Sequence, residues 1–311
     1  TGSPPAPPGP LSPSPFRPSP FIKMVLREPI GPKPFHKMVS ASLSRRFPEE
    51  LAALGDNVGL TVDTLREVER GSSAHIMLCV DLTEQVLAEA VSLHADFLVT
   101  YSPMPHSPLM RLSTDDVMGR ILLHCTNHQL AVHSIHSASD AAEGGINDWL
   151  ARALAPGHIS PIICHPKAPA AGQGRILECS NAIPLSSLVE RLKSLLQVRY
   201  VRLALGAIVD EESVARAQEC CYVKTIAVKV GEGASVLRSC AADVYVTSEM
   251  SHADVLAANA QGVIVLLTGQ STIERAFMVH LRQELEDEYA SSDWNVKVRC
   301  ASVDANPLAV V

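Results

Sequence analysis

One stretch of the chain occurs twice in related form, and this internal repeat most constrains the fold. Residues 95–102 read Ala-Asp-Phe-Leu-Val-Thr-Tyr-Ser, and residues 242–249 read Ala-Asp-Val-Tyr-Val-Thr-Ser-Glu. Each is an apolar run typical of a buried strand that leads into polar residues. In both halves a helix and a second strand follow, and that strand again ends in polar residues, 133–140 and 268–275. A chain that repeats such a unit is expected to fold into two related halves.

Strand and helix patterns alternate through both halves of the chain. Strands are predicted at residues 75–80, 96–100, 130–133, 201–205 and 226–230, and helices at 43–54, 84–93, 115–127, 147–154 and 185–196. This alternation predicts an α/β fold with two related lobes, mixed sheets flanked by helices, and a cleft between the lobes. Ligands of open α/β sheets bind beyond the carboxyl ends of the strands, so the polar strand ends are the candidate site.

The composition changes along the chain and predicts the domain boundaries. Residues 1–37 are rich in proline, which interrupts helices and sheet ladders, so this segment is predicted to be disordered. Residues 38–154 form the predicted first lobe and residues 185–311 the second. Residues 155–184, which begin with a Pro-, Ala- and Gly-rich stretch, are predicted to connect the two lobes.

Charge, hydropathy and cysteine spacing exclude several classes of protein. The net charge of -7 argues against general nucleic-acid binding, which needs a basic surface. No apolar window of about 18 residues occurs, so no membrane span is expected. The eight cysteines are scattered without a CxxC pair, which indicates reduced thiols rather than a disulfide framework or a zinc site. We therefore expect a cytoplasmic location, with mitochondria as the alternative.

Two carboxylates follow the strand ends at matching positions in the two halves. Asp140 lies four residues after His136, and Glu274 lies four residues after Gln270. Residues four apart share one face of a helical turn, so each pair has the spacing to bind a divalent ion, and two facing ions activate water. The same spacing also fits a hydrogen-bonded loop pair, or an acid favoured by a helix start.

A third polar cluster follows the strand of the second half. Glu249 and His252 have side chains that transfer protons, or that orient groups around a metal. The alternative is that this segment only begins a helix, with Ser251 as its cap. The serines near the histidines lack a Gly-x-Ser-x-Gly turn, so a serine hydrolase is not indicated.

Several blocks of the sequence match a known family in order. They are Asp-Asn-Val-Gly-Leu at residues 56–60, residues 134–151 around Asp140, Ser-Glu-Met-Ser-His at 248–252, and Glu274-Arg275. On these blocks the chain, from about residue 39 to its end, resembles a eukaryotic-type member of the NIF-three-like family (Ngg-one-interacting-factor-three-like proteins; GTP cyclohydrolase one type two homologues). Some relatives carry an inserted domain between the halves, and the short segment at 168–174 indicates that this chain lacks it.

The resemblance implies a two-lobed α/β fold, a dinuclear metal site at the lobe interface and a homo-oligomer, often a hexamer. Asp140 and Glu274 match the metal ligands of the family. Tyr101-Ser102-Pro103 stands where bacterial relatives have His-His-Pro and eukaryotic ones often Tyr-His-Pro, and Gln270 stands where relatives have a histidine. The expected metal site is therefore an altered one, formed by Asp140, Glu274, Gln270, Tyr101 and Ser102.

The altered ligand set affects both the metal and the function that we expect. Without imidazoles, oxygen-preferring ions such as Mg or Mn are favoured over Zn or Fe. One function is a metal-dependent hydrolase or cyclohydrolase-like enzyme in which His136, His252 and Glu249 handle protons. The alternative is a non-catalytic protein-interaction member with a degenerate metal site, since the family name records a transcription-related partner. A third is a small-ligand or metal-sensing module.

Overall fold

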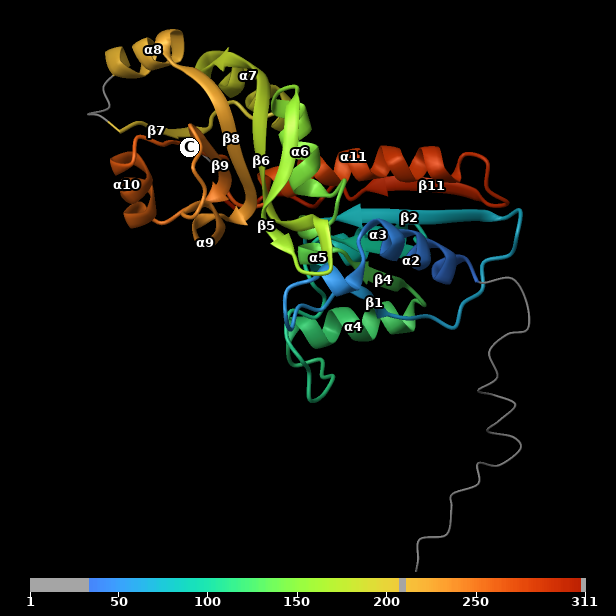
Figure 1. Cartoon of the computed structure of the whole chain (residues 1–311). Helices are drawn as coiled ribbons and strands as arrows, with labels where there is room; N and C mark the ends of the chain where they lie inside the picture. The colour runs from blue at the N-terminus through green and yellow to red at the C-terminus, as the bar shows by residue number, and fades with distance from the viewer. Residues whose placement is uncertain (1–33, 207–210, 309–311) are drawn as a thin grey trace, which may run out of the picture. The chain divides into compact units, whose positions relative to one another are not determined.

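The computed structural model describes residues 34–206 and 211–308 (Figure 1). Most of the predicted disordered segment, residues 1–33, lies outside the described residues. Residues 35–37 already belong to helix α2, Phe35–Arg46, because Phe35 is fully buried and its ring lies 5.7 Å from that of Trp294. The helix predicted over 43–54 therefore starts and ends eight residues too late. Pro48 disfavours helical backbone at Phe47, and only the short 3-10 helix η1, Glu49–Leu51, follows.

The first sheet has five strands in the order β1-β4-β3-β2-β11. Strands β2, β3, β4 and β11 run parallel, and β1 pairs antiparallel with β4. The apolar runs of the sequence form the buried central strands. The elements of this part are β1 (Gly59–Val62), β2 (Ser73–Cys79), α3 (Glu84–Ser92), β3 (Phe97–Thr100), α4 (Val117–Asn127), β4 (Ala131–Ser134), α5 (His136–Ala141), α6 (Ile146–Leu154) and β11 (Asn295–Cys300).

The second sheet has six strands in the order β5-β6-β8-β9-β10-β7. Strands β8, β9 and β10 run parallel, and the other pairs are antiparallel. The prediction of mixed sheets flanked by helices is therefore confirmed. The elements are β5 (Gly157–His165), β6 (Ala168–Pro184), α7 (Leu185–Leu196), β7 (Arg202–Ala204), α8 (Glu211–Cys220), β8 (Tyr222–Glu232), α9 (Ala234–Leu237), β9 (Val244–Glu249), α10 (His252–Ala260) and β10 (Ile264–Leu267).

The segment predicted to connect the lobes is regular structure. Most of residues 155–184 form the antiparallel hairpin β5–β6, which is paired from Gly157 to His165 and joins the second sheet through β8. Glycine in this hairpin allows the backbones of the two strands to approach each other closely. A Cβ at Gly172 would lie 2.1 Å from the carbonyl oxygen of Ile163 on the neighbouring strand, so no larger residue fits there.

The internal repeat of the sequence appears as the same succession of elements in each sheet. In the first, β3 leads through α4 to the parallel strand β4 and then to α5. In the second, β9 leads through α10 to the parallel strand β10 and then to α11, Thr272–Tyr289. The helices α5 and α11 therefore both start just beyond the carboxyl ends of parallel strands.

Helix α11 and strand β11 return the end of the chain to the first sheet. Figure 1 shows α11 beside β11, which pairs with β2 from Ser73 to Leu78. The inner face of α11 is buried at Phe277, whose ring lies 6.3 Å from Phe47 and 5.6 Å from Trp149. A single apolar cluster thus contains residues of both sheets and of α11.

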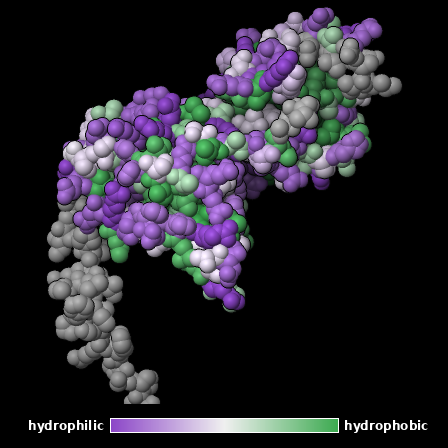
Figure 2. Space-filling view, turned by 180° about the vertical axis from the view of Figure 1, so that it is seen from behind, coloured by the Kyte–Doolittle hydropathy of each residue, from purple (hydrophilic) through white to green (hydrophobic). Residues whose placement is uncertain are grey.

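The surface is mainly hydrophilic on the face drawn in Figure 2. Hydrophilic residues cover most of the face seen in Figure 2, with smaller hydrophobic patches between them. None of the helices within the described ranges has the length and apolar character that crossing a membrane requires.

Candidate functional site

Asp140 is the centre of a small, partly buried polar cluster. It lies on α5, and both of its carboxylate oxygens are occupied by protein donors. Oδ1 accepts a hydrogen bond of 2.6 Å from the hydroxyl of Tyr101, which follows β3 directly. Oδ2 lies 3.1 Å from the ammonium Nζ of Lys229 on β8, and the side chains of Asp140 and Lys229 are only 15% and 16% exposed. The cluster therefore joins elements of the two sheets.

Glu274 is the second carboxylate of this cluster. It lies in the first turn of α11 and is 2% exposed, and its Oε2 has no hydrogen-bond partner among the described residues. Burial, with a smaller contribution from the negative charge of Asp140, raises the pKa of Glu274 to about 7, although Lys229 and Arg275 act in the opposite direction. The charge of Asp140 thus contributes to the raised pKa of Glu274, which takes up a proton at a higher pH than an ordinary glutamate.

Tyr101 links this cluster to His136. Burial and the adjacent charge of Asp140 raise the pKa of the Tyr101 hydroxyl well above its ordinary value, so it remains a hydrogen-bond donor. The ring of Tyr101 meets that of His136 edge-on, with the centroids 5.5 Å apart. His136 Nδ1 lies 2.8 Å from Oδ2 of Asp56, which leaves Nε2 as the ring nitrogen available for proton transfer.

Asp56 stays ionised beside His136. Burial acts to raise its pKa, but hydrogen bonds from Ser137 and His136 outweigh burial and lower the pKa below the ordinary value. A carboxylate that orients an imidazole in this way is a recurrent arrangement for proton transfer.

Two predicted metal ligands have other partners in the structure. The hydroxyl of Ser102 donates to Asp81 at 2.7 Å, and not to Asp140. Gln270 is exposed, and its backbone carbonyl accepts a hydrogen bond from the side chain of Asn306 at 3.0 Å. Of the five predicted ligands, the structure therefore places Tyr101, Asp140 and Glu274 in one cluster.

Of the two predicted proton-transfer residues of the second half, Glu249 forms an ion pair and His252 begins a helix. Glu249, at the end of β9, forms an ion pair of 2.6 Å with Arg202. Ser251 caps α10, because its hydroxyl accepts from the amide of Asp254, and His252 is the exposed first residue of that helix. The helix-cap alternative therefore describes this segment.

Sequence reasoning missed Lys229 and Asp56. Lys229 is the only charged residue of the apolar run 226–230, and a lone cation in a buried strand calls for a carboxylate partner. Asp56 was part of the first block that carried the resemblance, but its distance of 80 residues from His136 concealed the pairing.

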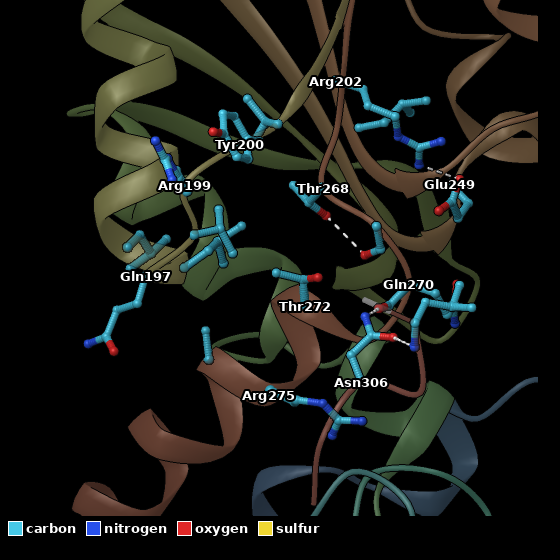
Figure 3. Close-up of a pocket in the computed structure, with 18 of the residues that line it drawn as sticks. Gln197, Arg199, Tyr200, Arg202, Glu249, Thr268, Gln270, Thr272, Arg275 and Asn306 are labelled. Carbon is cyan, nitrogen blue, oxygen red and sulfur yellow. Dashed lines mark hydrogen bonds and ion pairs between the residues drawn. The ribbon is translucent and has the colours of Figure 1, made fainter. Parts of the chain in front are cut away.

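A separate groove of about 1110 Å³ lies at the edge of the second sheet (Figure 3). It is bounded by the end of α7 and the following segment, the ends of β9 and β10, the start of α11, and Asn306 and Leu308. Figure 3 shows Arg202 directed at Glu249 on one side, and Tyr200 and Arg199 on the other. Gln270 and Glu249 therefore belong to this groove.

The described residues do not fit the dinuclear metal site that the resemblance implies. Within 34–206 and 211–308, no group of three or more His, Cys, Asp or Glu side chains is placed to hold a metal ion. At Asp140, a lysine ammonium and a tyrosine hydroxyl contact the oxygens that a metal would use. Hard ions require several oxygen ligands at about 2.0–2.6 Å, which this arrangement does not offer.

Comparison with solved structures supports the architecture described above. A Bacillus cereus protein related to NIF3 superimposes with a TM-score of 0.72 over 89% of this chain and 99% of that chain, at 19% sequence identity. At that identity the likeness concerns the fold alone.

Comparison of sequences adds the family. The NIF3 homolog of Schizosaccharomyces pombe is 32% identical over 273 residues, which cover 85% of this chain and 94% of that protein. The NGG1-interacting factor 3 of Saccharomyces cerevisiae is 29% identical, over 86% of this chain and 94% of that protein. The family model described as Duf34/NIF3 (NGG1p interacting factor 3) matches residues 36–307. The chain therefore belongs to the Duf34/NIF3 family.

Proposed function

We propose that this chain is a non-catalytic, protein-binding member of the Duf34/NIF3 family. The observation that carries the proposal is the groove of about 1110 Å³ at the edge of the second sheet. Three of its lining residues expose large apolar side chains, namely Tyr200 at 61%, Val279 at 52% and Leu308 at 76%. Apolar surface gathered in an open groove, rather than scattered singly, is a mark of an interaction site.

The proposed occupant is an extended, apolar segment of a partner protein that carries an acidic residue. The groove is larger than the roughly 300–1,000 Å³ of ordinary small-molecule pockets, and consecutive residues before β7, from Leu195 to Val201, line it. Two of its arginines already have carboxylate partners, Arg202 with Glu249 and Arg275 with Asp304. The guanidinium of Arg199 lies 5.1 Å from the Tyr200 ring and, among the described residues, contacts no carboxylate.

The name of a relative supports this class of function. The Saccharomyces cerevisiae protein is called an interacting factor of NGG1, so a protein partner is recorded in its name. A protein-binding role needs neither the imidazole ligands that this chain lacks nor an open metal site. The homo-oligomer and hexamer implied by the resemblance, and the cytoplasmic or mitochondrial location, stay predictions.

The test is selection of peptides from a display library of random 12-residue segments. Enriched peptides are expected to be apolar with an acidic residue. They should bind the variants Tyr200→Ala and Arg199→Ala at least about tenfold more weakly than the wild-type protein, because truncating a hot-spot residue of an interface has an effect of that size. Tyr222→Ala is the matched control, because Tyr222 is also exposed, at 64%, and is not among the residues that line the groove. Absence of enrichment, or peptides indifferent to both groove variants, would refute the proposal.

A metal-dependent hydrolase is the second candidate, and one observation favours it. Among the residues that the structure describes, Oε2 of the buried Glu274 has no hydrogen-bond partner, which is the state of a carboxylate oxygen able to bind a ligand. In that candidate the divalent ion is Mg, Mn, Zn or Fe, and His136 is the residue placed for proton transfer. Hydrolysis of nucleotide or phosphoester substrates that needs added metal, and that is lost in Glu274→Gln, would establish it over the binding proposal.

A further inference from the structure

The pair formed by Lys229 and Asp140 stands where the resemblance implies a metal. We propose that the Lys229 ammonium is the resident cation of this cluster and excludes a divalent ion from it. The inference goes beyond the proposed function, because protein binding at the groove requires neither Lys229 nor a metal.

The ammonium is held in place from the side of the second sheet. Lys229 lies in β8, between strands β6 and β9, and its register is fixed by pairing with Thr247. Nζ donates to Oδ2 of Asp140 at 3.1 Å and also to the carbonyl oxygen of Val230. Two of its three donor hydrogens are therefore engaged by acceptors within the cluster.

Asn147 on α6 fixes Asp140 relative to strand β8, which carries Lys229. The fully buried side chain of Asn147 donates to the backbone carbonyl of Asp140 at 2.9 Å. Its Oδ1 accepts from the amide of Val230 at 2.9 Å. Asp140 and Lys229 are thus parts of one closed set of hydrogen bonds, and their contact does not depend on a flexible surface side chain.

A divalent ion and this ammonium cannot share the cluster. An ion bound to Oδ2 of Asp140 would lie within a few ångströms of Nζ, at a distance where like charges repel strongly in a buried setting. Oδ1 is already occupied by the Tyr101 hydroxyl, which burial keeps protonated. At the start of α11, the charge of Asp140 raises the pKa of Glu274 and the ammonium of Lys229 lowers it, so the ammonium offsets negative charge there. The ammonium of Lys229 thus neutralises part of the carboxylate charge that a metal ion would otherwise neutralise.

The experiment is titration with Mn²⁺ alone, because the side chains around Lys229 offer oxygen ligands. Electron paramagnetic resonance of free Mn²⁺ measures binding to wild type, Lys229→Met and Lys229→Arg. Methionine keeps the length of the side chain without its charge, and arginine keeps the charge. We expect no saturable binding by wild type or Lys229→Arg. Lys229→Met is expected to bind one Mn²⁺, with a dissociation constant at least about tenfold below any residual wild-type binding. Adding Asp140→Asn to Lys229→Met is expected to remove that site.

Stoichiometric Mn²⁺ binding by wild type would overturn the proposal, and this measurement needs no variant. Failure of a folded Lys229→Met protein to bind more Mn²⁺ than wild type would also overturn it. Circular dichroism and gel filtration establish folding, and Lys229→Gln is the second neutral variant if methionine prevents it. Peptide binding at the groove is expected to be unchanged in these variants, so failure here is distinct from failure of the protein-binding proposal.

Discussion

The buried ion pair of Arg175 and Asp148 offers a sharp test of how the two parts of the fold are joined. Arg175 on β6 is 1% exposed, and its Nε donates to Oδ1 of Asp148 on α6 at 2.6 Å. Its other nitrogens donate to the backbone carbonyls of Gly172, Gly174, Ala141 and Ala142 at 2.7–3.1 Å. Every donor direction is therefore satisfied, but among the described residues Asp148 is the one carboxylate that pairs with this positive charge.

Replacing Asp148 by asparagine removes the negative charge that pairs with Arg175, with little change of side-chain volume. Breaking one partner of a buried pair typically costs about 3–5 kcal/mol. The asparagine amide would also meet the backbone N–H of Gly144, which donates to Oδ2 of Asp148 at 2.5 Å, so two donors would face each other. With about 2.1 cal/mol/K per residue over roughly 270 residues, this loss lowers the melting temperature by roughly 5–9 °C.

Thermal and urea unfolding followed by circular dichroism measure the change. The control is Asp293→Asn, which breaks the exposed ion pair with Arg70 and is expected to cost at most ~1 kcal/mol. The double variant Arg175→Met plus Asp148→Leu removes both buried charges, but it leaves the four carbonyls without the arginine donors, so it is expected to recover only part of the loss. Equal stability of Asp148→Asn and wild type would refute the assignment of Arg175 as a buried charge that depends on this carboxylate.

Three further changes test other parts of the fold. Burial lowers the pKa of His133 to about 4 from 6.5, so below pH 6.5 the unfolded chain takes up a proton that the folded state refuses. The free energy of unfolding should fall by roughly 3 kcal/mol from pH 6.5 to pH 4 through this residue. In urea unfolding, His133→Gln should lack this dependence on pH. The same pH dependence in wild type and variant would contradict the lowered pKa of His133. Phe277→Ala is expected to cost about 3–5 kcal/mol in urea unfolding, whereas Leu256→Ala at an exposed site should be neutral. In Gly145→Ala the new Cβ would lie 2.0 Å from the carbonyl oxygen of Ser139, so the loop after α5 must shift; a wild-type melting temperature would exclude this clash.

The sequence alone predicted about half of the helices and strands, those that depend on local patterns. The helix predicted at 84–93 is α3, and Thr83 caps it by accepting from the amide of Val86 at 3.2 Å. The helix predicted at 185–196 matches α7 at both ends. The repeated strand pattern likewise predicted β3 and β9, because a buried strand needs a continuous apolar run.

Local patterns failed where the partner is distant in the chain. The hairpin β5–β6 has the composition of a loop, and only pairing along β8 makes it part of a sheet. Strand β11 pairs with β2 although more than 200 residues separate them, and its own six residues do not reveal that choice. Such pairings are decided by which edges and apolar faces remain to be covered once the lobes form.

The candidate site shows the same division. The sequence, through its resemblance, singled out Asp140, Glu274 and Tyr101, which the fold brings into one cluster. It did not reveal that Lys229, 89 residues from Asp140, places an ammonium against that carboxylate. Residue types and their spacing show which chemical groups the chain contains. An ion pair between residues of two sheets, however, forms only when both sheets have folded and are packed together. The tertiary structure therefore decided which cation the carboxylate meets.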